Sequence, residues 1–294
     1  MDITLALGGG GAKGNSHIGV LRRLEKEGFR IRAVAGTSFG GLVAAAYASG
    51  RTPDEIEALF SKVDQARLYG HMPGEGPSLL GLAGATKWLN EVFGTTTFDD
   101  LPLPCAVTAV DLKSAREVIL SEGLVRDALL ATIALPGIFP PRRIQEWELV
   151  DGGTLDPVPV SVARILAPGL PVVAVVLTAP VGHPARALEV TWTGIPGSIA
   201  RRIIRMRPAQ AFDVFLQAVD IGNRLMTELR LEVDEPDVVI RPAVNHIQLL
   251  DNVNVSEVAR LGEQAVEAVL PNLRRVTAWP ARFMRSFSVR PTAK

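Results

Sequence analysis

Short runs of buried-type residues alternate with segments of helical spacing in the first fifty residues of the chain. Residues 3–7 (ITLAL) and 30–36 (RIRAVAG) have the aliphatic and β-branched composition of buried strands. Each run is followed by a segment with helical spacing of its apolar residues, at positions 17–28 and 41–50. Strand and helix alternating over so short a stretch are typical of a βαβα unit with a parallel sheet. Helices are therefore expected on both faces of that sheet.

The same alternation continues to the end of the chain. Further strands are predicted at residues 105–110, 116–120, 147–150, 172–177 and 237–240, and further helices at residues 124–133, 160–166, 212–231 and 255–269. Thr52 and Glu55 have the spacing of a capping box, which predicts a helix from Pro53 through Phe60. The order of elements favours an α/β fold throughout.

One domain is expected to account for nearly all of the 294 residues, because a chain of this length can bury a single large core. We place the domain at residues 1–275 and interpret residues 276–294 as a basic C-terminal tail without regular structure. Residues 69–84 are rich in Gly and Pro, and they predict a long surface loop or lid. No apolar run approaches the roughly 20 residues of a membrane span.

The charge balance argues against a nucleic-acid partner, because 31 Lys and Arg residues face 31 Asp and Glu residues. The single cysteine, Cys105, lies in an apolar run (PCAVTAV) where a thiol behaves as a small hydrophobe, which suits a reducing compartment. The N-terminus lacks the basic region of a secretion signal. These features favour a cytoplasmic protein, soluble or bound only peripherally to a membrane, and none of them predicts an oligomeric state.

A glycine-rich loop follows the first predicted strand and precedes the first predicted helix. Its backbone N–H groups, over residues 8–14 (GGGGAKG), are suited to binding an anion. The spacing also fits the dinucleotide fingerprint G-x-G-x-x-G, which requires an acidic residue at the end of the second strand. That strand ends instead in Val34, Ala35 and Gly36. A nucleotide cofactor is therefore not expected, and no cofactor or metal is predicted.

Residues 36–40 (GTSFG) match the G-x-S-x-G nucleophile elbow, between a predicted strand and a predicted helix. In such a turn Ser38 would adopt a strained conformation that exposes its hydroxyl, and the flanking glycines would remove clashing Cβ atoms. The alternative is a closely packed turn in which Ser38 only caps the helix near Gly41. The glycine-rich loop favours the first interpretation, because it can supply donors to an oxyanion.

A serine nucleophile needs a base, and the sequence offers four histidines and one well-placed carboxylate. His17, on the first predicted helix, is expected to pack or to cap rather than to act as the base, and His71 and His183 fall in loop segments. His246 follows the last predicted strand, where a Ser-His-Asp hydrolase would place its base. Asp151 precedes two glycines at the carboxyl end of the strand at residues 147–150, and Ser38 also follows the end of a strand. A partly dry site would raise the pKa of the Asp151 carboxyl, so that it could act as the base for Ser38. The alternative is that Asp-Gly-Gly forms a simple turn with no catalytic role.

Three segments together resemble the patatin-like phospholipases: GGGGAKG, GTSFG and the DGG that begins at Asp151. The resemblance covers roughly residues 3–255, and it implies a three-layer α/β/α patatin-like fold with a mostly parallel central sheet. It also implies that Ser38 is the nucleophile and Asp151 the base of a dyad without histidine. The backbone amides of Gly9, Gly10 and Gly11 would then form the oxyanion hole. By the same resemblance Lys13 helps to set the loop rather than taking part in the chemistry.

The expected activity is metal-free hydrolysis of fatty-acyl esters, of the phospholipase A, lysophospholipase or carboxylesterase type, with a fatty-acyl ester or phospholipid as substrate. Phe39, a bulky neighbour of the nucleophile, would narrow the acyl pocket. Three alternatives stay open. The first is another hydrolysis on the same dyad, such as thioester, lysophospholipid or peptide cleavage. The others are a Ser-His-Asp esterase that uses His246 and a non-catalytic lipid-binding protein on the same scaffold. Residues 195–207 interleave apolar residues with four arginines, which fits either contact with anionic lipid or a solvated helix face. These arginines are Arg201, Arg202, Arg205 and Arg207.

Overall fold

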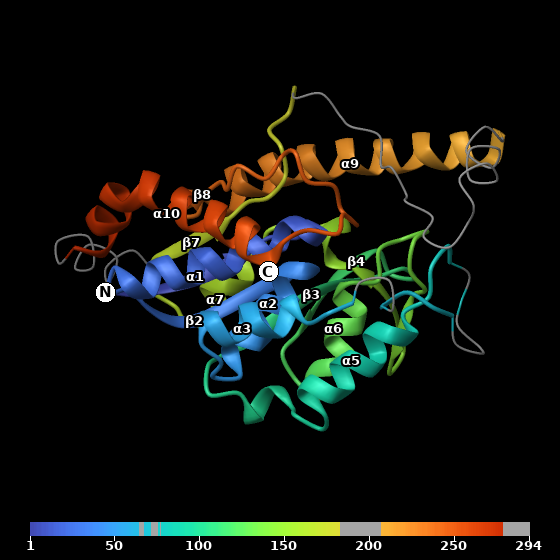
Figure 1. Cartoon of the computed structure of the whole chain (residues 1–294), viewed down its shortest axis with the longest axis horizontal. Coiled ribbons are helices and arrows are strands. Elements are labelled where there is room, and N and C mark those ends of the chain that lie inside the picture. The colour runs from blue at the N-terminus through green and yellow to red at the C-terminus, as the bar shows by residue number, and fades with distance from the viewer. Residues whose placement is uncertain (65–67, 72–75, 77, 183–206, 279–294) are drawn as a thin grey trace.

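A single sheet of eight strands forms the centre of the computed structural model, which describes residues 1–64, 68–71, 76, 78–182 and 207–278 (Figure 1). The strands run in the order β5-β6-β3-β2-β1-β7-β8, and β4 pairs with β3. Neighbours from β3 through β8 in this order are parallel, whereas β4, β5 and β6 pair in antiparallel fashion. The strands are β1 (Asp2–Leu7), β2 (Arg30–Thr37), β3 (Cys105–Asp111), β4 (Arg116–Leu120), β5 (Arg142–Ile144), β6 (Trp147–Asp151), β7 (Val172–Val175) and β8 (Val238–Ile240).

Helices cover both faces of the sheet, as the alternating pattern predicted. On one face α7 packs on the sheet and contacts α9, which runs along the top edge of the view in Figure 1. On the other face lie α1, α2 and α6, with α10 packed against α1. The α-helices are α1 (Ser16–Lys26), α2 (Phe39–Ala48), α3 (Pro53–Ser61), α5 (Ala83–Phe93), α6 (Val125–Thr132), α7 (Val160–Leu166), α9 (Arg207–Asp234) and α10 (Val255–Thr277). The short 3₁₀ helices are η1 (Gly11–Asn15), η2 (Phe98–Asp100) and η3 (Gly152–Thr154). The result is a three-layer α/β/α fold.

Alanines form a row across four adjacent strands on the face that α7 covers. Ala106, Ala35, Ala6 and Ala174 are register partners in turn, and all four are fully buried. Side chains of neighbouring positions along each strand point to the opposite face, where larger aliphatic residues such as Leu5, Leu7 and Val173 form the main core. The small side chains let the α7 layer lie close to the sheet.

Two strands that are far apart in sequence meet end to end along β3. β2 pairs with β3 up to Thr37 opposite Thr108, and β6 pairs with β3 from Asp151 opposite Ala109 onward. β4 occupies the other edge of β3 over both stretches, so β2 and β6 must share the remaining edge. Thr37 and Asp151 therefore lie opposite two consecutive residues of β3, Thr108 and Ala109.

The predicted elements agree with the observed ones to within a few residues for most of the chain. One expectation is corrected: β6 is antiparallel to β3, so Asp151 and Ser38 do not meet through the shared carboxyl edge of parallel strands but through the end-to-end arrangement on β3. Pattern reading also did not identify β5 and α5. α9 begins at Arg207, earlier than predicted, and α10 continues past Pro271 to Thr277, beyond the predicted domain end at residue 275.

The Gly/Pro-rich loop at residues 69–84 packs on the protein where it is described. Tyr69 stacks on Phe139, with the ring centroids 5.5 Å apart, and the amide of Leu80 donates to the Ile138 carbonyl over 2.8 Å. Leu82 is buried. The described residues of this loop therefore pack partly against the protein, while His71 and Gly76 are exposed, as expected of a loop at the surface.

The structure also bears on the predicted capping box, on Cys105 and on the expected absence of a membrane-spanning helix. The capping box at Thr52 and Glu55 is present, and Cys105 is buried, which raises the pKa of its thiol to about 12. No helix in the described part of the chain combines the length and the apolar character that a membrane crossing requires. Of the predicted tail at 276–294, residues 279–294 lie outside the described residues. The same holds for His183 and for the segment 195–207 up to residue 206.

Candidate active site

Ser38 lies in a strained turn between β2 and α2. Its φ of 55° and ψ of −126° fall where residues other than glycine are uncommon. A Cβ on Gly36 would come within 2.5 Å of the Gly40 carbonyl group, and one on Gly40 would overlap the Leu7 carbonyl oxygen. The flanking glycines therefore allow strand and helix backbones to approach closely, as the elbow motif predicted.

Hydrogen bonds from three directions hold this turn. The backbone N–H of Ser38 donates to the Thr132 hydroxyl at the end of α6 over 2.8 Å. The Thr37 hydroxyl lies 2.7 Å from the Thr108 hydroxyl and donates to the Asp156 carbonyl over 2.9 Å. The Ser38 side chain makes no capping bond to α2, which argues against the simple capping interpretation. The strained conformation is thus fixed by buried neighbours.

Asp151 ends β6 and faces Ser38. Its backbone N–H donates to the Ala134 carbonyl over 2.9 Å, and its Oδ1 accepts from the Gly153 N–H over 2.7 Å. Burial raises the pKa of the Asp151 carboxyl to about 6, although hydrogen bonds from the Ser38 side chain and the Gly153 amide lower it. The carboxylate is therefore more basic than an exposed aspartate and hydrogen bonds to the Ser38 side chain.

The glycine-rich loop lies against the nucleophile turn. A Cβ on Gly9 would be 3.2 Å from the Ser38 Cβ. The Gly9 N–H already donates to the Pro157 carbonyl over 3.0 Å, which corrects the prediction that Gly9 is an oxyanion donor. Within the described residues, no backbone hydrogen bond takes up the N–H groups of Gly10 or Gly11. Of the three amides predicted to form the oxyanion hole, those of Gly10 and Gly11, at the start of η1, therefore remain available.

Side chains that follow the glycines hold the loop in place. Asn15 Nδ2 donates to the Ala12 carbonyl over 3.0 Å, and Ser16 Oγ donates to the Lys13 carbonyl over 2.8 Å. The buried His17 donates from Nε2 to the Gly8 carbonyl over 2.8 Å, and burial lowers its pKa to about 4. His17 is thus packed in the interior and supports the loop, in line with the expectation that it packs or caps.

Two other histidines, His71 and His246, lie in the described part of the chain, and neither is hydrogen-bonded to Ser38 there. His71 is exposed and lines neither of the two cavities described below. His246 is exposed and lines one of them, but no hydrogen bond joins it to Ser38 or Asp151 among the described residues. Its position keeps a histidine-dependent mechanism as a rival to test. No cluster of three potential metal-ligating side chains occurs in the part of the chain that the structure describes.

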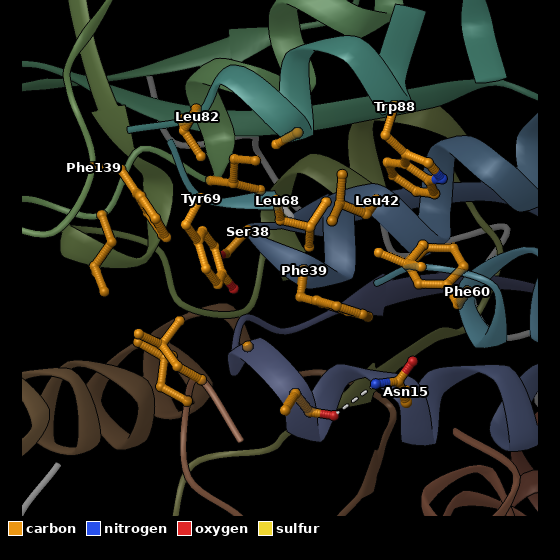
Figure 2. Close-up of a pocket in the computed structure, with 18 of the residues that line it drawn as sticks. Asn15, Ser38, Phe39, Leu42, Phe60, Leu68, Tyr69, Leu82, Trp88 and Phe139 are labelled. Carbon is orange, nitrogen blue, oxygen red and sulfur yellow. Dashed lines mark hydrogen bonds between the residues drawn. The ribbon is translucent and has the colours of Figure 1, made fainter. Parts of the chain in front are cut away.

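An apolar cavity of about 140 Å³ opens from Ser38 (Figure 2). Phe39, Phe60 and Trp88 form an aromatic row along it, with successive ring centroids 5.3 Å and 5.4 Å apart. In Figure 2, Tyr69 and Phe139 lie toward the left of the view and Phe60 and Trp88 toward the right, with Ser38 between them. Phe39 is thus part of the cavity wall, consistent with its expected effect on the pocket.

A second, larger and more polar cavity of about 630 Å³ adjoins the first. Ser38, Asp151, Leu135 and Leu249 line both cavities. The face of α9 that includes Leu216, Asp220, Asn223 and Arg224 walls the second cavity. The serine–aspartate pair is therefore placed between an apolar and a polar compartment.

Sequence reasoning did not identify three residues that shape this site. Thr132 binds the Ser38 amide, Leu249 lines both cavities, and Asp156 accepts the Thr37 hydroxyl bond through its carbonyl. All three act through contacts between segments far apart in the chain. The only sequence signal was the position of Asp156 shortly after the DGG motif.

Comparison with known sequences finds a protein family and several relatives that this chain resembles. Residues 5–164 match the family model of the patatin-like phospholipases. An uncharacterized NTE family protein of Mycobacterium bovis is 33% identical over 215 residues, which cover 72% of this chain and 58% of that protein. The lysophospholipase NTE1 of Mycosarcoma maydis is 30% identical over 170 residues, which cover 55% of this chain and 9% of that protein. The chain spans less than two thirds of the length of these relatives.

Among solved structures, the fold is similar to that of VipD from Legionella pneumophila. The TM-score is 0.56 at 13% sequence identity, and the match covers 92% of this chain and 66% of the VipD chain. At this identity the similarity concerns the fold alone.

Proposed function

The chain belongs to the patatin-like phospholipase family, and from this membership and the geometry of the site we propose that it is a lipid acyl hydrolase. Ser38 is the nucleophile and Asp151 the general base of a dyad that needs no histidine. The observation that carries the proposal is the contact of a strained serine with a buried carboxyl of raised pKa, at the junction of two cavities.

In the first step the Ser38 Oγ attacks the ester carbonyl carbon while Asp151 takes the hydroxyl proton. The amides of Gly10 and Gly11 donate to the oxyanion of the tetrahedral intermediate, and the N-terminus of α2 adds a favourable field. The C–O bond to the alcohol then breaks, and Asp151 returns its proton to the leaving oxygen. The acyl group is now bound to Ser38.

In the second step water attacks the acyl-enzyme while Asp151 again acts as base. The second tetrahedral intermediate collapses, the bond to the Ser38 Oγ breaks, and that oxygen recovers the proton from Asp151. The fatty acid leaves, and the site is ready for another cycle. The apolar cavity lined by Phe39, Phe60 and Trp88 is suited to the acyl chain.

Hydrolysis of a short-chain p-nitrophenyl ester tests this mechanism directly. Ser38→Ala and Asp151→Asn should each lower kcat/KM by roughly 10³-fold or more, because each removes a member of a unit that acts together. Both should also lose labelling by a fluorophosphonate probe. Ser49→Ala, at the end of α2, serves as the matched control and should retain activity.

The rival mechanism is separated by one further variant. If His246→Ala abolishes turnover while Asp151→Asn retains most of it, the base is His246 and the dyad proposal is wrong. A wild-type protein that neither turns over esters nor reacts with the probe would instead support a binding protein on this scaffold.

A further inference from the structure

The outer side of α9 is apolar along most of the helix. It includes five large aliphatic side chains that are exposed, spaced four or seven residues apart so that they share one side of the helix. They are Val214, Ile221, Leu225, Leu229 and Val233. Ala218 and Gly222 are exposed on the same side and add no polar group. These seven residues are called the apolar face of α9.

The charged side chains of α9 are turned toward the rest of the protein. Arg224 pairs with Asp220 in the wall of the polar cavity, and Arg230 pairs with the buried Asp156. Between residues 214 and 234, Glu232 is the only charged residue among the exposed ones. A surface helix ordinarily buries its apolar side and exposes its charges, so α9 has the reverse arrangement. In Figure 1 no other labelled helix or strand lies above it.

Gly222 lies near the middle of the apolar face and has no evident role within the chain. In the described structure no atom lies within 4 Å of the position that a Cβ on Gly222 would take. Glycine inside a helix is less favourable than alanine, and the backbone here has no positive φ that would require it. The open space above Gly222 is suited to a large side chain from another molecule.

The apolar face is complementary to itself if a second copy of α9 runs antiparallel to the first. In a pair with two-fold symmetry, positions at equal distances from the middle of the contact lie opposite each other. With the middle between residues 223 and 224, the opposed pairs are Val214 with Val233, Ala218 with Leu229, and Gly222 with Leu225. Two of the three pairs place a leucine against a small residue, which lets the helices approach closely.

We propose that this face joins α9 to α9 of a second copy of the chain, as an antiparallel helix pair. Two such faces would bury on the order of 1,000 Å² in total, near the lower limit of a specific interface, so dissociation in roughly the micromolar range is expected. A bilayer surface fits less well, because helices that bind there carry Lys or Arg beside the apolar side. Both arginines between residues 214 and 234 are instead paired with acids.

Sedimentation velocity of the full chain between about 1 and 100 µM tests the proposal, because a dimer of this strength forms within that range. Ile221→Glu should raise the dissociation constant about 100-fold or more, since each dimer would then bury two unpaired carboxylates. Ile165→Glu on α7 is the matched control. Ile165 is 53% exposed and Ile221 57%, so both variants should fold, but only Ile221 lies on the apolar face. The control should dimerise like wild type.

Disulfide cross-linking tests the direction of the helices. Val214→Cys and Val233→Cys are conservative changes, and the native Cys105 is buried, so it does not compete. In oxidised glutathione a mixture of the two variants should give a covalent dimer on a non-reducing gel, whereas either variant alone should give little. A covalent dimer of Val214→Cys with itself would mean a parallel pair and would contradict the proposed arrangement.

A monomer at every concentration would overturn the proposal, as would a dimer that Ile221→Glu leaves intact. If wild type stays monomeric but sediments with phosphatidylcholine vesicles, and Ile221→Glu does not, the face binds lipid and the proposed partner is wrong. Ser38→Ala should dimerise like wild type. The outcome is therefore independent of whether the protein hydrolyses esters.

Discussion

Arg230 on α9 reaches the completely buried carboxyl group of Asp156, with its Nη2 3.0 Å from Oδ2. Asp156 lies five residues after Asp151, and its carbonyl accepts the Thr37 hydroxyl bond next to Ser38. The neighbouring Pro157 carbonyl accepts the Gly9 amide. This ion pair therefore joins α9, the wall of the polar cavity, to the segments that carry the nucleophile, the base and the glycine-rich loop.

Arg230→Met should destabilise the protein more at high pH than at low pH. Burial and the nearby charge of Glu117 raise the pKa of Asp156 to about 8, against the effect of Arg230. Loss of Arg230 raises the pKa of Asp156 further. The variant therefore loses most stability above pH 8, where the folded wild type holds Asp156 ionised beside Arg230. We expect a loss of about 2 kcal/mol in the free energy of unfolding at pH 9 and a smaller loss at pH 6. Urea unfolding at both pH values measures the difference.

Arg241→Met is the control for this measurement, because the pair of Arg241 with Glu228 is partly exposed and also involves α9. Its effect should be below about 1 kcal/mol and nearly independent of pH. A deficit of Arg230→Met that is the same at pH 6 and pH 9 would contradict the assignment of a buried, titrating Asp156.

Ester hydrolysis should decline as the pH falls through about 6. The base must be ionised to accept a proton, and the pKa of Asp151 is raised to about 6 by burial, so the carboxylate form is lost below that pH. The logarithm of kcat/KM for a neutral ester should rise with unit slope up to this point and then level off. Full activity down to pH 4.5 would mean that burial does not raise the pKa of Asp151. A low-pH limb that disappears in His246→Ala would assign the base to the histidine.

Replacing the nucleophile should stabilise the turn when the replacement is glycine. The φ of 55° at Ser38 is strained for an L-residue and ordinary for glycine. Ser38→Gly should therefore be more stable than Ser38→Ala by about 1 kcal/mol, and both should be inactive. Thermal unfolding of the pair tests this difference. At Ser49, where φ is −75°, the order of the two replacements should reverse.

A smaller side chain at position 39 should shift the acyl-chain preference. The Phe39 ring packs against Phe60 in the cavity wall, so Phe39→Leu lengthens or widens the space available to the chain. Relative kcat/KM for a longer over a shorter p-nitrophenyl ester should rise about 3- to 10-fold. Phe29→Leu changes a buried phenylalanine that lines neither cavity, and it should leave the ratio unchanged.

Local patterns were sufficient to predict most of the fold. The strand at residues 116–120 and the helix at residues 160–166 were predicted with the observed bounds, because the spacing of apolar residues that predicts them acts over neighbouring residues. The antiparallel direction of β6 was not predicted, since strand direction depends on pairing with β3 and not on the composition of residues 147–151. β5 has three residues, only one of them apolar, which is too short for a periodic signal.

The candidate site was predictable to the extent that it rests on motifs. GTSFG, DGG and the glycine-rich loop identified Ser38, Asp151 and their neighbourhood from residues alone. The bond that removes Gly9 from the set of donors could not be foreseen, because its acceptor is Pro157, far along the chain. The contacts of Thr132, Leu249 and Arg230 depend in the same way on tertiary packing.

The end-to-end placement of β2 and β6 on β3 also has a consequence for the time course of folding. Ser38 lies within a local βα unit, whereas Asp151 reaches it only after more than a hundred intervening residues have been arranged around β3. Contacts of such long sequence separation form late, because the chain must close a large loop before it gains the pairing. Reactivity of Ser38 toward a fluorophosphonate during refolding would then act as a clock for the last stage of assembly, appearing only after the secondary structure is complete.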